Sequence, residues 1–264
     1  MLAKPAQTLV QTVRGFINQA GFDVVRTVPC SMLPCLGSLP ALMKVLFPAL
    51  AVDCVIDVGA NDGQFGAFIR RLGYAGLIVS FEPAIIPFRN LERRARKDGN
   101  WLACQLAAGS KEAEAEMHIS KSSELNSFKS VNDLGREILG DGAESASVER
   151  VRVVRLDEFL PNAIGPFQAE RLLLKLDTQG WDLEAAEGAE GLMDDVVAVQ
   201  TEVAFHALYD GSPSFKESFE YFLERGFDLL TVSPVSVDFQ RLVAIESDCL
   251  FVRPIPIEAR RVPV

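Results

Sequence analysis

The glycine-containing turn at residues 57–63 constrains the fold of this chain more than any other feature. An apolar run at 53–58 leads into the turn and is typical of a buried strand. Apolar residues at helical spacing follow over 63–73, where Phe65 and Ile69 share a face. A strand, a tight turn and a helix form the first half of a β-α-β crossover. The turn therefore predicts a parallel sheet covered by helices.

The same alternation of strands and helices continues to the end of the chain. We predict further strands at 77–82, 101–107, 171–176, 195–203, 227–233 and 248–253, a polar strand at 113–119, and helices at 86–98, 181–192 and 214–225. Such alternation predicts a doubly wound, mostly parallel α/β sheet, and the last two strands predict an antiparallel edge.

The N-terminal part of the chain has a different pattern. Apolar residues at helical spacing over 6–20 predict a helix, and a proline-rich connector over 27–50 contains a short expected helix at 39–47. We therefore expect a helical extension or cap over 1–50 and one α/β domain over 51–264. Covering the active site, forming a homodimer contact and peripheral contact with a membrane all remain open as its role.

A polar segment at 120–148 is the longest region without an expected strand or helix. It is rich in serine, asparagine, glutamate and glycine, including Ser127. Long loops in compact domains usually have a function or are mobile. We expect this segment to be a loop on the substrate side of the domain.

Composition excludes several classes of protein. The formal net charge of −10 argues against a nucleic-acid partner. Prolines and a lysine interrupt the apolar residues 32–52, which argues against a membrane span, and the N-terminus lacks a secretory layout. The five cysteines form no paired motif, so reduced structural thiols are expected. We predict a cytoplasmic protein.

Ligands of an open parallel sheet bind beyond the carboxyl ends of its strands. Polar or glycine residues follow five of the expected strands, at 57–63, 82–83, 106–109, 175–180 and 202–206. Each segment alone is compatible with ordinary turn or helix-capping chemistry. Together they predict a ligand site at one edge of the sheet.

The first turn indicates which ligand that site takes. Pyrophosphate-binding turns follow Gly-x-Gly-x-x-Gly, but here Ala60 and Asn61 follow the first glycine. Asp57 and Asp62 add two carboxylates, which suit an ammonium or sulfonium group better than a diphosphate. Glu82, at the tip of the next strand, can accept both hydroxyls of a ribose. S-adenosyl-L-methionine carries all of these groups.

Residue roles follow from these positions. A hydroxyl acceptor must lose its proton, and a histidine or carboxylate within reach is the usual base; the rest of the reaction requires alignment. One histidine with two carboxylates could also hold Mg²⁺ or Mn²⁺, but without a tighter motif we assign no metal. The expected residues are Asp57, Gly59, Ala60, Asn61, Gly63, Glu82, Pro83, Ala107 and Ala108 for the cofactor, His206, Asp177 and Glu202 for catalysis, and Lys175, Gln179 and Ser127 for the substrate.

The chain resembles the FkbM family of S-adenosylmethionine-dependent methyltransferases over about residues 52–253. The resemblance is carried by Val55 to Gly63, Phe81-Glu82-Pro83, Leu156-Asp157, and Leu174 to Asp182 continuing through Gly188-Ala189. It implies a Rossmann-like class I methyltransferase fold with seven strands, and O-methylation, commonly of sugar hydroxyls on glycans, glycolipids or secondary metabolites. Many relatives carry a glutamate where this chain has Gln179, so no acid role is assigned there.

Two other functions remain open at this stage. A nicotinamide-dependent oxidoreductase would share the sheet, although the phosphate-binding Gly-x-Gly-x-x-Gly turn is missing. A non-catalytic binding protein could retain the same fold. We expect an O-methyltransferase acting on a small-molecule or glycan acceptor, and methyl transfer to a glycan would separate it from both.

Overall fold

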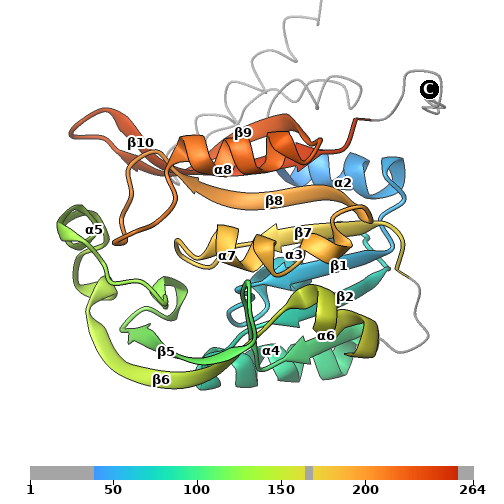
Figure 1. Ribbon diagram of the computed structural model, residues 1–264, viewed down its shortest axis with the longest axis horizontal. Coiled ribbons are helices and arrows are strands. Elements are labelled where there is room, and N and C mark those ends of the chain that lie inside the picture. Colours follow the sequence, from blue (N-terminus) through green and yellow to red (C-terminus); the bar gives the residue numbers. More distant parts are fainter. Residues whose placement is uncertain (1–38, 164–168, 255–264) are drawn as a thin grey trace, which may run out of the picture. The chain divides into compact units, whose positions relative to one another are not determined.

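The computed structural model describes residues 39–163 and 169–254, which form an α/β domain around a seven-stranded sheet (Figure 1). The strand order is β3-β2-β1-β7-β8-β10-β9. The strands are β1 (Cys54–Val58), β2 (Leu77–Phe81), β3 (Trp101–Cys104), β7 (Leu172–Leu176), β8 (Val196–Ala204), β9 (Asp228–Asp238) and β10 (Val243–Val252). The first five in this list run parallel, and β10 is antiparallel to β8 and β9. The predicted doubly wound sheet with an antiparallel edge is confirmed.

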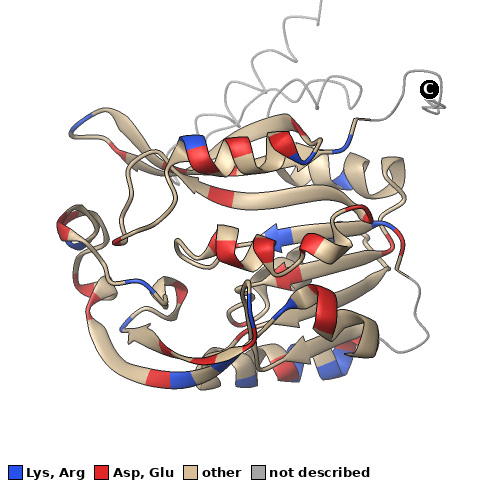
Figure 2. Cartoon of the chain, viewed as in Figure 1, with Lys and Arg blue, Asp and Glu red and all other residues tan. Residues whose placement is uncertain are grey.

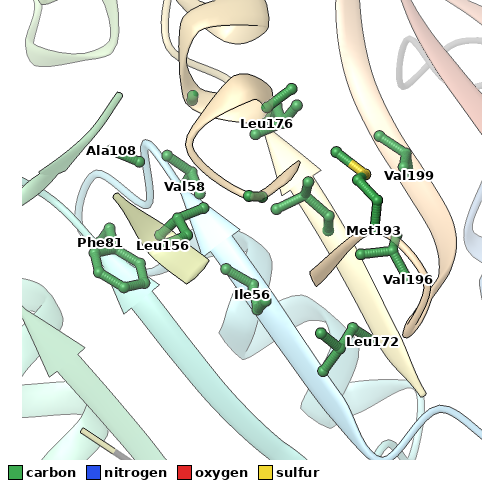
Figure 3. Packing of buried hydrophobic residues seen from close by; sticks show 14 of the residues in the cluster. Ile56, Val58, Phe81, Ala108, Leu156, Leu172, Leu176, Met193, Val196 and Val199 are labelled. Atoms are coloured by element: carbon green, nitrogen blue, oxygen red, sulfur yellow. The ribbon is translucent and has the colours of Figure 1, made fainter. Parts of the chain in front are cut away.

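Helices cover both faces of the sheet. Alternate side chains of a strand such as β1 point to opposite faces, and both sets include apolar residues that need to be buried. Ile56 packs in one core with residues of α6 (Leu156–Ala163), α7 (Asp182–Glu187) and α8 (Phe215–Glu224), and Figure 3 shows part of this core. Val55 packs in the other core with residues of α2 (Leu39–Ala49), α3 (Gln64–Arg71) and α4 (Ile85–Asp98).

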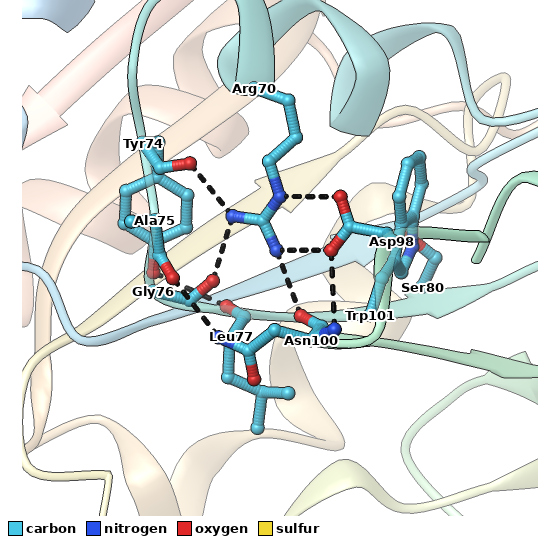
Figure 4. A network of polar contacts seen from close by, with 9 residues as sticks. All are labelled: Arg70, Tyr74, Ala75, Gly76, Leu77, Ser80, Asp98, Asn100 and Trp101. Carbon is cyan, nitrogen blue, oxygen red and sulfur yellow. Dashed lines mark hydrogen bonds and ion pairs between the residues drawn. The ribbon is translucent and has the colours of Figure 1, made fainter. Parts of the chain in front are cut away.

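One arginine ties the end of α3 to the loops before two strands. Arg70 donates to the carbonyls of Tyr74, Gly76 and Asn100 and forms a bidentate pair with Asp98 at 2.9 Å (Figure 4). The two-pronged geometry suits a planar guanidinium. The network holds the amino ends of β2 and β3 next to α3, on the side away from the strand tips.

The segment 120–148 is more ordered than its composition predicted. It contains η2 (Ser123–Leu125), α5 (Asp133–Leu139), η3 (Gly140–Ala143) and the start of β6 (Ser145–Val154). With β4 (Ala107–Ala108) and β5 (Ala113–Ser120), β6 forms a second sheet in the order β4-β6-β5. The expectation of one irregular loop is therefore wrong.

The polar strand β6 was missed because it is mostly exposed and carries charges. Figure 2 shows an acidic segment followed by basic ones along it, which are Glu149, Arg150 and Arg152. Two of its arginines form cross-strand ion pairs with β5 or the turn before it, Arg150 with Glu114 and Arg152 with Glu112. Charge pairing of this kind needs a partner strand. The apolar part of β6 is short, because only Val151, Val153 and Val154 are buried.

The expected helix at 39–47 is present as α2. The predicted helix over 6–20, and with it most of the extension over 1–50, lies outside the described residues. The predicted strand at 101–107 is divided between β3 and β4, and the predicted helix at 181–192 is divided into α7 and η4 (Glu190–Leu192). Cys54, Cys104 and Cys249 are buried free thiols. In the part of the chain that the structure covers, none of the helices is long and apolar enough to cross a membrane.

Candidate active site

A cavity of about 570 Å³ opens where β1, β2, β7 and β8 end. This is the edge at which an open parallel sheet binds its ligands. Its lining combines turn backbone, aromatic rings and carboxylates from segments far apart in the sequence. The lining residues used below are Gly59, Ala60, Asn61, Phe65, Glu82, Pro83, Ala107, Ala108, Asn126, Phe128, Lys175, Asp177, Gln179, Trp181, Gln200, Glu202 and Asp248.

The turn after β1 requires its first glycine. Gly59 has φ +73°, and a Cβ added there would lie 1.9 Å from the carbonyl oxygen of Asp177. The turns after β1 and β7 therefore touch through backbone alone, which only glycine permits. Gly63 also has positive φ and precedes α3, but it is not among the cavity-lining residues.

Glu82 lies at the tip of β2 with both carboxylate oxygens oriented by backbone. Oε2 accepts from the amide of Asn61 at 2.8 Å and Oε1 from the amide of Ala84 at 2.9 Å. Each oxygen keeps a second lone pair for a ligand hydroxyl. Burial raises the pKa of Glu82 to about 7. The side chain is thus a pre-oriented acceptor for two adjacent hydroxyls.

Asp57 does not line the cavity. It is fully buried, accepts from Ser80 Oγ at 3.0 Å, and forms an ion pair with Lys175 at 3.2 Å. Burial raises the pKa of Asp57, and Lys175 opposes that rise. Ser80, Asp57, Lys175 and Gln200 are register partners on neighbouring strands, so they form a polar row across the sheet. Asp57 therefore sits behind the cavity and fixes the lysine that reaches it.

Lys175 has three polar neighbours for its three ammonium protons. Besides Asp57, its Nζ pairs with Asp177 at 3.2 Å and donates to the carbonyl of Gly59 at 3.3 Å. It also lies 5.6 Å from the ring centroid of Phe65. The ammonium therefore serves to hold the β1 and β7 turns together and to orient Asp177.

The side-chain amide of Gln179 bridges Asp177 and Glu202, the two carboxylates that the sequence predicted to be catalytic. Gln179 Nε2 donates to Asp177 at 3.3 Å and to Glu202 at 3.2 Å, while Tyr209 donates to its Oε1 at 2.7 Å. The tyrosine fixes the amide so that its nitrogen faces both acids. Gln179 has φ +54°, an uncommon conformation for a residue with a side chain. A glutamate here would place a third carboxylate between two others.

Glu202 has no cationic partner among the described residues. Burial raises its pKa well above the ordinary value, and the negative charge of Asp177 raises it further. Asp177, by contrast, is paired with Lys175. The two carboxylates therefore differ in environment although one amide joins them.

The segment 123–128 crosses one side of the cavity. Asn61 Nδ2 donates to Ser123 Oγ at 3.2 Å, and Ser127 Oγ donates to the carbonyl of Gln179 at 2.8 Å. These bonds attach it to the turns after β1 and β7. Asn126, which lines the cavity and is 7% exposed, has no hydrogen-bond partner for Nδ2 within the described chain.

The structure gathers most, but not all, of the predicted site residues. Ser127 is buried outside the lining, and His206 is exposed and absent from the lining. The sequence reading missed Asn126, Gln200 and Asp248. Gln200 precedes Glu202 by two on one strand and could have been inferred from strand periodicity. No group of three His, Cys, Asp or Glu within 39–163 and 169–254 is arranged to hold a metal ion.

Comparison with known protein families finds one match. A model described as the methyltransferase FkbM domain matches residues 57–229. No curated protein sequence matches the chain.

Several solved structures overlap the chain at low identity. An rRNA methylase from Streptococcus thermophilus has 13% identity over 82% of this chain and 97% of that one, with a TM-score of 0.41. Aeropyrum pernix fibrillarin, solved with S-adenosyl-L-methionine bound, has 11% identity over 76% and 66%, with a TM-score of 0.42. A TehB-like methyltransferase from Corynebacterium glutamicum has 11% identity over 95% and 100%, with a TM-score of 0.38. The family assignment rests on the domain match.

Proposed function

This chain belongs to the FkbM family of S-adenosylmethionine-dependent methyltransferases, and from that premise we propose that it methylates a hydroxyl group of a sugar. The cofactor is S-adenosyl-L-methionine, which supplies, when bound, a methyl group on a positively charged sulfur. The chain's own residues bind and orient both reactants and take the proton of the hydroxyl. Family membership favours this reaction over a nicotinamide-dependent oxidation.

The cavity fits the cofactor. Glu82 offers two oriented oxygens to the ribose hydroxyls, and the turn from Gly59 to Asn61 lets backbone approach the ligand. Ala107 and Ala108 are buried lining residues that leave room for a flat base. The carboxylates along the cavity suit the sulfonium charge.

We assign the role of general base to Glu202. A base works best when its pKa lies near the working pH. Burial raises the pKa of Glu202 well above its ordinary acidic value. Asp177 is the weaker candidate because its carboxylate is already engaged by Lys175 at 3.2 Å. In this proposal, Asp177 and Gln179 orient the acceptor and Glu202 removes its proton.

A sugar fits the remaining lining better than a nucleic acid does. Trp181 and Phe128 have ring centroids 5.0 Å apart, and such rings pack against the apolar face of a sugar. Asp177, Glu202 and Asp248 accept hydrogen bonds from hydroxyls but repel phosphates. The possibility of a homodimer stays a prediction.

Radiolabelled methyl transfer into extracted glycans and lipids tests the proposal. We expect label in a glycan fraction, and we expect Glu202→Gln to lower kcat by about 10²-fold or more without weakening cofactor binding. Glu224→Gln, an exposed change on α8, is the matched control. Label in RNA alone, or full activity in Glu202→Gln, would contradict the proposal. A loss of activity in His206→Ala instead would return the base role to the histidine.

A further inference from the structure

Three acceptor-bearing side chains share one side of the strand pair β8 and β10. Gln200 and Glu202 are two residues apart on β8, and Asp248 is the direct register partner of Glu202 on β10. All three line the cavity. They present carboxylate and amide oxygens beside the residues assigned to the reaction.

This side of the cavity has an excess of negative charge. The lining contains five carboxylates against Lys175 and Arg71, and Lys175 is already engaged by two aspartates. Neither Glu202 nor Asp248 forms an ion pair with a lysine or arginine that the structure describes. Burial raises the pKa of Asp248 and the negative charge of Asp177 raises it further, while a side-chain hydrogen bond with Gln200 opposes the rise. A bound cation would offset this charge.

An unpartnered buried oxygen lies in the same group. Gln200 is 5% exposed, and its Oε1 has no hydrogen-bond partner among the described residues. Buried polar atoms are nearly always paired, so an unpartnered oxygen on a side chain that lines the cavity indicates a missing donor. Lys175, its register neighbour on β7, has already committed its protons elsewhere.

A protonated amine fits these acceptors better than a metal ion does. Metal coordination requires several ligands converging within about 2–2.6 Å of one point, and no group of three or more His, Cys, Asp or Glu among the described residues is so arranged. An ammonium group has three donors and bridges acceptors spaced further apart. It also brings a positive charge to Glu202 and Asp248, neither of which is paired with a described lysine or arginine.

We propose that Gln200 and Asp248 form a subsite for a protonated amine of the acceptor, so that the substrate is an amino sugar. The inference rests on the proposed function and names the class of acceptor for the same site. The amine donates hydrogen bonds to Asp248 and Gln200, and the neighbouring hydroxyl of the acceptor faces Glu202. Its positive charge favours the ionised form of Glu202, which is the form that can take a proton.

Binding of matched oligosaccharides to the protein saturated with S-adenosylhomocysteine tests the subsite. The probes are β-1,4-linked tetramers of glucosamine, N-acetylglucosamine and glucose, which differ at the amine. By calorimetry near pH 6.5 we expect the glucosamine tetramer to bind about tenfold or more tightly than the other two. Asp248→Asn should remove that preference and keep the affinity for S-adenosylhomocysteine, and Glu224→Gln should preserve both.

The outcomes separate this inference from the proposed function. Equal binding of the three tetramers, no binding of the glucosamine tetramer, or an unchanged preference in Asp248→Asn overturns the amine subsite. Methyl transfer to the same tetramers is measured in parallel. Equal transfer to a neutral tetramer would leave the methyltransferase proposal standing and remove the amine. Amine-selective binding without methyl transfer to any sugar would support the amine subsite and contradict the proposed methyl transfer to a sugar.

Discussion

At the scale of single residues, acidic side chains at similar places in the sequence perform different tasks. Asp57 is on β1 and Glu82 directly follows β2, yet only Glu82 lines the cavity. Asp57 is turned into the sheet, where Ser80 and Lys175 bind it. An acidic residue near a strand end therefore indicates a ligand contact only when its side chain reaches the open edge.

Cofactor affinity should depend on pH through Glu82. Its pKa is raised to about 7 by burial, so lowering the pH through 7 protonates it and removes one acceptor for the ribose hydroxyls. We expect the Kd for S-adenosylhomocysteine to rise about tenfold between pH 7.5 and 5.5. The Glu82→Gln variant should bind S-adenosylhomocysteine weakly, and its Kd should change little over this pH range. Calorimetric titration measures both, and equal slopes for the two proteins would contradict the assignment.

At the scale of elements, the site depends on two turns that touch through backbone. The turn after β1 passes so close to the turn after β7 that Gly59 has no room for a side chain. The segment 123–128 then joins both turns through Ser123 and Ser127. The candidate site is thus formed by contacts among loops, and the strands set the spacing of those loops.

Gly59→Ala should therefore be strongly destabilising. Positive φ adds strain, and the Cβ would collide with the carbonyl of Asp177. We expect a loss of about 3 kcal/mol or more in the free energy of unfolding, measured by urea denaturation. Gly73→Ala is the matched control, because Gly73 also has positive φ but nothing within 4 Å of an added Cβ. That variant should lose about 1 kcal/mol. Equal losses would show that the turns are free to separate.

At the scale of the whole domain, a polar row crosses an otherwise apolar sheet. Trp101 Nε1 donates to Ser80 Oγ at 2.9 Å, Ser80 donates to Asp57, and Asp57 pairs with Lys175. The row joins four strands, from β3 to β7. Charges this deeply buried are stable only when each has its partner.

Removing one member of the ion pair should cost more than removing both. We expect Lys175→Met to lower the free energy of unfolding by about 3–5 kcal/mol, because it leaves Asp57 buried without a cation. The double variant Lys175→Met with Asp57→Asn should be more stable than Lys175→Met alone. Chemical denaturation of the two variants and of Asp57→Asn completes the cycle. Additive losses would mean that the pair is not coupled.

Local patterns were sufficient for most of the sheet. Each buried strand appears in the sequence as an apolar run, and each covering helix appears as apolar residues at helical spacing. The order of these elements could therefore be predicted from the sequence. The strand β6 escaped because its buried apolar residues are confined to its last four positions, while its first four residues are exposed. Its buried residues Val151 and Val153 pack with Met117 of β5, a contact that becomes visible only when the two strands pair.

By itself, the sequence determined the alternation of strands and helices, the tight turn after β1, and the polar residues at the strand tips. These properties depend on residues close together in the chain. Only the tertiary structure decided that Asp57 faces Lys175, that Asp248 lies opposite Glu202, and that His206 is exposed away from the cavity lining. Those outcomes depend on strand register and loop path, which are settled by contacts between segments far apart in sequence.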